Sequence, residues 1–104
     1  MVNEPIYSIV AMSDVLPASA LMCTKRLTGL SLAEVKSRVA SGAPLVTCGC
    51  TDDDGLELIV RIHDSLDGEG VETRVFRGNR PEPYEFLLNL LETHRQIDEE
   101  DYWD

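Results

Sequence analysis

The sequence has 104 residues, a formal net charge of −10 and 43% apolar residues. This length is typical of a single domain, and the apolar fraction is sufficient for one small hydrophobic core. No apolar run reaches the roughly 18–20 residues that span a bilayer, and residues 1–5 lack the positive segment of a secretory signal. We therefore expect a cytoplasmic protein that binds no membrane.

The charge is distributed unevenly along the chain. Residues 1–44 carry four basic and three acidic side chains, whereas residues 45–104 carry five basic and sixteen acidic ones. An acidic surface repels nucleic acid and attracts cationic proteins. The charge therefore favours a cationic protein as partner over nucleic acid; the alternative is that the acidity serves solubility alone.

The first half of the chain predicts two strands and two helices. A β-branched, aromatic run predicts a strand over residues 6–12, and Ser13-Asp14 offers side-chain oxygens that can cap a helix over residues 18–27. Gly29 ends that helix. Ser31 and Glu34 form a capping box for a second helix, which residues 41–44 end before a strand over residues 45–48.

The second half predicts a helix, a strand and a further helix. The acidic run of Asp52, Asp53 and Asp54 fits the positive end of a helix dipole better than it fits a calcium-binding loop, because the other oxygen ligands of such a loop are missing. We expect the helix that starts here to end near residues 68–70. A strand over residues 71–76 and a linker over residues 77–83 precede a helix over residues 84–96.

The apolar stripe of the helix over residues 84–96 is too broad for a free surface helix. We expect the helix to cover the face of the sheet that the other helices leave open. Alternatively, Tyr84, Phe86 and Leu90 form a partner interface or a homodimer through this helix.

The order β-α-α-β-α-β predicts an α+β fold, a two-layer sandwich with the helices on one face. Residues 1–77 form this domain, residues 78–97 are a linker and an added helix packed on it, and residues 98–104 are a mobile acidic tail.

Two segments of the sequence resemble a known family. The run Thr28-Gly29-Leu30-Ser31-Leu32-Ala33-Glu34-Val35-Lys36, followed by Val39, is similar to the joint between the first two helices in the C-terminal domain of the bacterial ribosomal stalk protein. Gly70-Val71-Glu72-Thr73-Arg74-Val75 is similar to the final strand of that domain. The resemblance covers about residues 5–77 and implies the same fold, which the Clp protease adaptor for N-terminal degrons also uses.

The resemblance also implies where a partner could bind. The stalk domain recruits translational GTPases through lysines on its first two helices, and this chain retains Lys25 and Lys36 at matching places but has Met22 and Ala33 at others. We therefore expect the fold without the stalk protein's identity. An adaptor of the translation or Clp protease machinery would use Lys25, Arg26 and Lys36.

No pattern of catalytic residues is found, and we expect a protein that is not an enzyme and needs no cofactor or metal. Cys48 and Cys50 share one strand face, without the paired partners of a zinc site. His63, Asp64 and Ser65 are the residue types of a hydrolytic triad, but consecutive helical residues point about 100° apart and are not expected to converge.

The leading hypothesis is a non-catalytic, immunity-type inhibitor that covers the basic surface of a toxin or another cationic protein. Acidic and aromatic residues would make the first contacts. These partner-binding residues are Asp52, Asp53, Asp54, Asp98, Glu99, Glu100, Asp101, Tyr102 and Trp103.

Overall fold

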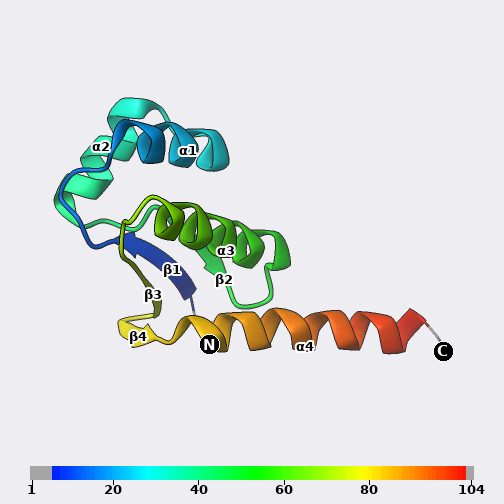
Figure 1. Ribbon diagram of the computed structural model, residues 1–104. Coiled ribbons are helices and arrows are strands. Elements are labelled where there is room, and N and C mark those ends of the chain that lie inside the picture. Colours follow the sequence, from blue (N-terminus) through cyan, green and yellow to red (C-terminus); the bar gives the residue numbers. More distant parts are fainter. Residues whose placement is uncertain (1–5, 103–104) are drawn as a thin grey trace.

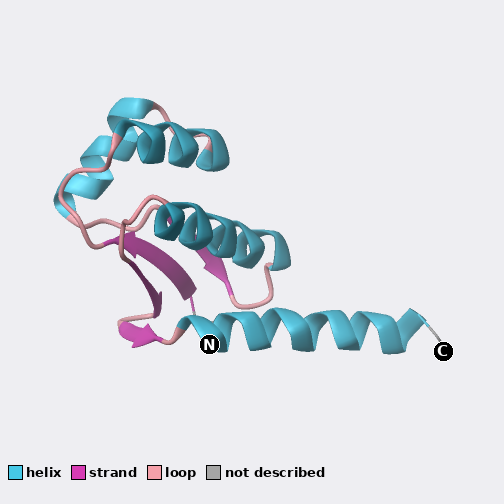
Figure 2. Cartoon of the chain, in the orientation of Figure 1, coloured by secondary structure: helices cyan, strands magenta, loops and turns pink. Residues whose placement is uncertain are grey.

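The computed structural model describes the backbone of residues 6–102 and the side chains of residues 6–94. Within this part the elements are β1 (Ile6–Ala11), α1 (Ala18–Thr28), α2 (Leu32–Ser41), β2 (Val46–Gly49), α3 (Asp53–Gly68), β3 (Thr73–Arg77), β4 (Arg80–Glu82) and α4 (Tyr84–Tyr102) (Figures 1 and 2). The strands form one antiparallel sheet in the order β2-β1-β3-β4. The predicted α+β class is confirmed.

The hydrophobic core lies between the sheet and α3. In β1, alternate residues Tyr7, Ile9 and Ala11 are buried, as expected for one face of a strand. The side chains of α3 that pack over β1, β2 and β3 recur every three or four residues and are fully buried: Leu56, Ile59, Ile62 and Leu66. One contiguous core therefore joins the two layers.

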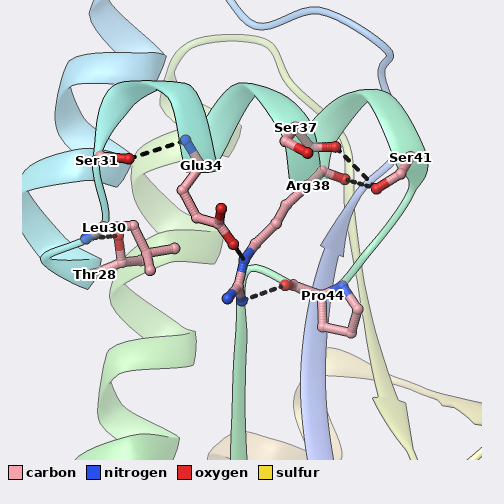
Figure 3. A network of polar contacts seen from close by, with 8 residues as sticks. All are labelled: Thr28, Leu30, Ser31, Glu34, Ser37, Arg38, Ser41 and Pro44. Atoms are coloured by element: carbon pink, nitrogen blue, oxygen red, sulfur yellow. Dashed lines mark hydrogen bonds and ion pairs between the residues drawn. The ribbon is translucent and has the colours of Figure 1, made fainter.

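The joint between α1 and α2 is held by local hydrogen bonds (Figure 3). Gly29 ends α1 in the left-handed conformation, with φ at 73°, and its N–H donates to the Lys25 carbonyl. The Ser31 hydroxyl accepts from the Glu34 N–H at 3.1 Å, which confirms the predicted N-cap. The segment from Thr28 to Glu34 therefore forms a defined turn between the two helices.

A second set of contacts ties α2 to the loop that precedes β2. The Glu34 carboxylate accepts a hydrogen bond from Arg38 Nε at 3.1 Å, and Arg38 Nη1 donates to the Pro44 carbonyl at the same distance (Figure 3). The predicted capping box is therefore only half formed, because the Glu34 side chain pairs with Arg38 one helical turn away.

One expected cap, one expected linker and one expected helix end are wrong, although α1 begins at Ala18 as expected. Ser13 and Asp14 do not cap α1, which begins after Pro17 with no side-chain cap. The expected linker contains β4, whose residues pair with β3 across a Gly78-Asn79 turn in which Gly78 has a φ of 61°. The backbone of α4 continues to Tyr102 instead of ending at residue 96, so the acidic segment begins as helix.

The position of α4 also differs from the expectation. It packs along α3, where its buried residues Leu87 and Leu91 join the common core, instead of covering the opposite face of the sheet. That opposite face carries the remaining side chains of β1, which are Ile6, Ser8 and Val10. The side of α3 left open by α1 and the sheet accommodates the broad apolar stripe of α4.

The close packing of α3 on β2 can be tested at Gly55, which lies in the first turns of α3. A Cβ atom at Gly55 would lie 2.5 Å from the Cys48 Cβ and 2.8 Å from Asp52 Oδ2. We expect Gly55→Ala to lower the free energy of unfolding by about 1–3 kcal/mol, because α3 must move away from β2. Urea denaturation measures the change.

The matched control is Gly68→Ala, at the other end of the same helix. No atom lies within 4 Å of a Cβ at Gly68. The control is expected to be neutral or to stabilise by roughly 0.5–1 kcal/mol, since alanine restricts the unfolded chain. Equal effects at the two sites would contradict the close approach of α3 to β2.

Candidate functional site

The predicted acidic residues at the start of α3 have different local roles. Asp52 is the N-cap, and its Oδ1 accepts from the Gly55 N–H at 3.0 Å. Asp53 accepts a hydrogen bond from His94 Nδ1 of α4. Asp54 is exposed and lines a shallow surface with Glu57 and Arg61. Of the three aspartates, only Asp54 has no structural role among the described contacts.

The contact between Asp53 and His94 brings the two predicted acidic segments to one corner of the molecule. Asp98 follows His94 by four residues on the same helix, which is about one turn or 6 Å. The segment from Asp98 to Tyr102 therefore continues α4 past the start of α3 (Figure 1). Its side chains, together with Trp103 and Asp104, lie outside the described residues. We call residues 52–54 and 98–101 the acidic corner.

The helices that build this corner carry most of the negative charge. By sequence, α3 and α4 contain eleven acidic and two basic residues, while α1 and α2 contain one acidic and four basic residues. Negative charges crowded at one surface repel each other and make the local electrostatic potential more negative. By sequence, the fold therefore separates two helices of net negative charge, α3 and α4, from two helices of net positive charge, α1 and α2.

A groove of about 340 Å³ lies between α3 and α4. Val60, Leu88 and Leu91 provide apolar walls, and the groove is also lined by Glu57, Arg61 and Glu92. On α4, Phe86 is 59% exposed and Leu88 is 40% exposed. The sequence did not predict this groove, because it depends on α4 lying along α3.

Tyr84 and His63 connect the first turn of α4 to the C-terminal half of α3. Their rings stack with centroids 3.6 Å apart, and the Tyr84 hydroxyl donates to Asp64 Oδ1 at 2.9 Å. The hydrogen bond from His63 is the main cause that lowers the pKa of Asp64, and the bond from Tyr84 adds to it. Burial, followed by the Asp64 hydrogen bond, raises the pKa of Tyr84 to about 12.

The neighbouring residues His63 and Asp64 do converge, contrary to the expectation, because His63 Nδ1 lies 3.1 Å from Asp64 Oδ1. Ser65 is not part of this contact. Asp64 and His63 instead meet Tyr84, which gives the pair a structural role in holding α4.

The cysteines do not form a common site with His63. Cys48 is buried beneath the start of α3 near Gly55, and Cys50 packs against the same core. His63 lies eight residues beyond Gly55 on α3, which is about 12 Å along the helix. Burial raises the pKa of the Cys48 thiol to about 11, which keeps it protonated and a poor nucleophile. Within residues 6–94, no three His, Cys, Asp or Glu residues gather as metal ligands.

The alternative partner residues lie on α1 and α2. Lys25 and Arg26 line a surface hollow with Met22, which is 44% exposed. Lys36 of α2 lines a separate apolar groove. Among the described side chains, no carboxylate forms an ion pair with these three cations, and Glu34 pairs with Arg38 instead. Lys36 is therefore not paired with the neighbouring acidic residues among the described side chains.

A scan against protein-family models finds no match to this chain, and neither do searches of curated proteins and of solved structures. In the described part of the chain, no helix combines the length and apolar character needed to cross a membrane.

The raised pKa of Tyr84 predicts a specific loss of stability at alkaline pH. A raised pKa means that the folded state favours the neutral phenol. The stability that the neutral phenol contributes is therefore complete below pH 10.0 and is lost as the pH rises towards about 12. We expect the stability of Tyr84→Phe to fall less steeply across this range. Unfolding curves at a series of pH values measure the difference.

The comparison isolates Tyr84, because Cys48 and Tyr7, whose pKa values are also raised, remain in both proteins. An Asp64→Asn variant provides a second check. Removal of the carboxylate should lower the pKa of Tyr84, as read from tyrosine absorbance. Identical alkaline profiles for the wild type and Tyr84→Phe would show that the phenol is not held as described.

Proposed function

We propose that this chain is a non-catalytic protein-binding module that covers a cationic protein, in the manner of an immunity-type inhibitor of a toxin. The observation that carries the proposal is the acidic corner. The hydrogen bond between Asp53 and His94 holds the start of α3 beside α4, where the sequence adds four consecutive acidic residues. Such a concentration of negative charge steers a basic partner and speeds its capture.

The groove between α3 and α4 supports the same proposal. Charge alone gives fast association but modest affinity, and a stable complex needs apolar anchors that lose water. Phe86 and Leu88 are exposed apolar side chains on α4, and Glu57 and Glu92 line the groove beside Leu88. A basic segment with an apolar side chain would match both features.

For the fold, we propose the arrangement of the C-terminal domain of the ribosomal stalk protein over residues 6–77. The order β-α-α-β-α-β, the antiparallel sheet with β1 between β2 and β3, and the short α1–α2 joint at Gly29 support this proposal. Strand β4 and helix α4 are then additions to that arrangement.

A second candidate is an adaptor of the translation or Clp protease machinery that uses α1 and α2. The observation in its favour is that Lys25, Arg26 and Lys36 are exposed and have no acidic partner in the described residues, with Met22 exposed beside them. Such a surface would engage an acidic partner. The two candidates therefore use opposite faces and opposite charges.

The test starts with capture of partners on the immobilised chain from the cell that produces it, followed by calorimetry with the purified partner. Replacing Asp98, Glu99, Glu100 and Asp101 by their amides removes four charges without changing the side-chain size. We expect this variant to bind a basic partner at least about tenfold more weakly and with less dependence on salt.

The matched control reverses two charges on the other face, in the variant Lys25→Glu with Lys36→Glu. An inhibitor should retain its affinity for a basic partner with this control and should block the partner's activity. Loss of binding in the control, with full binding by the amide variant, would reject the inhibitor and support the adaptor.

A further inference from the structure

A second apolar groove, formed by the segment before α1 and by the helices α1 and α2, is not used by the proposed inhibitor. Its lining is almost entirely aliphatic and consists of Val15, Leu16, Leu21, Val39 and Ala40, with Asp14 and Lys36 as the polar residues. Its volume is about 340 Å³, in the lower part of the range for small ligand pockets, roughly 300–1,000 Å³. Val15 is 77% exposed. This groove has the size and character to take an apolar side chain.

Positive charge surrounds one side of this groove. Lys36 is part of its lining, and Lys25 lies one helical turn from the lining residue Leu21 on the same face of α1. Both lysines and the adjacent Arg26 are exposed and lack an ion-pair partner among the described residues. Asp14 is the one acidic residue of the lining, so a ligand with an apolar group next to several negative charges fits the side of the groove where Lys36 and Lys25 lie.

The sequence itself contains a segment with this chemistry. Residues 98–104, Asp-Glu-Glu-Asp-Tyr-Trp-Asp, combine five acidic residues with two aromatic ones. No other stretch of seven residues in the chain has this combination. Aromatic side chains are the most effective anchors in protein interfaces, and the acids would neutralise the cationic rim.

The backbone of α4 leads this segment away from the groove of its own chain. The last described contact of α4 with the body is at His94, and from there the helix continues for eight residues, about 12 Å, to Tyr102. In Figure 1 this end of α4 points away from α1, α2 and the loop before α1. Contact between the two surfaces therefore requires two molecules.

We propose that residues 98–104 of one copy bind the groove of Val15, Leu21 and Lys36 on a second copy. Trp103 or Tyr102 enters the groove, and the acidic residues before them face Lys25, Arg26 and Lys36. Because the two contacting surfaces are different, the contact is head-to-tail and leaves one free groove and one free tail at the ends of each assembly. The assembly therefore grows with concentration instead of stopping at a closed dimer.

The experiment is sedimentation velocity of the purified full chain over a range of concentrations, at about 50 mM and about 500 mM salt, because screening weakens such a contact. We expect species larger than a dimer at low salt and monomers at high salt. Lys36→Glu, which alters the groove, and Trp103→Ala, which alters the tail, should each weaken self-association at least about tenfold.

A mixture of the two variants gives the decisive result. The intact tail of Lys36→Glu can bind the intact groove of Trp103→Ala, so the mixture should form a 1:1 dimer and nothing larger. Arg74→Glu, an exposed change on β3 away from the groove, should behave as the wild type.

Three outcomes would overturn the proposal. The first is a wild-type chain that stays monomeric at all concentrations at low salt. The second is a closed dimer unaffected by Lys36→Glu, which would point to the exposed Phe86 face of α4. The third is a mixture of variants that does not associate. Because the assay contains only this chain, it is independent of whether a cationic partner exists.

Discussion

One apolar stripe on α3 holds the molecule together. Leu56, Ile59, Ile62 and Leu66 are completely buried, and burial of each such side chain stabilises the fold by roughly 1.5–3 kcal/mol. The sheet, α1 and α4 all pack on this one helix. The positions of the basic surface on α1 and α2 and of the acidic corner therefore both depend on α3. A change that loosens α3 would alter both surfaces together, whereas exposed substitutions can alter one at a time.

Two polar contacts fix the direction of α4 relative to α3. Tyr84 meets His63 and Asp64 at one end, and His94 meets Asp53 at the other, so α4 runs antiparallel to α3. The second contact engages Oδ1 of Asp53, and the N-cap role engages Oδ1 of Asp52, so among the three aspartates only Asp54 makes no such contact within the described residues. The proposed recognition by the acidic corner therefore rests mainly on Asp54 and on the sequence of residues 98–101. The apolar contacts of Leu87 and Leu91 hold the helix where its charges repel those of α3.

The sequence predicts features set by neighbouring residues better than features set by distant ones. The α1–α2 joint depends on Gly29 and Ser31, which act within one turn, and the apolar spacing of α3 predicts its buried face directly. Strand β4 was missed although Gly78-Asn79 is a hairpin signal, because the two prolines beside it favour a loop. The position of α4 was wrong because its broad stripe shows that it is buried, but not against which element. The grooves were missed for the same reason, since each is lined by two or more elements that meet only in the fold.

The basic surface on α1 and α2 and the acidic residues 98–104 together have a consequence that neither has alone. A chain with an apolar groove beside Lys25, Arg26 and Lys36 and an acidic aromatic segment elsewhere is complementary to itself, and association in trans follows if its own tail cannot fold back. In the two proposals the same residues 98–104 bind either a cationic partner or a second copy, so the two interactions exclude each other. A partner with a denser positive charge than Lys25, Arg26 and Lys36 would displace the second copy. Self-association would then keep the tail covered until such a partner is present, and dilution or salt would release it without one.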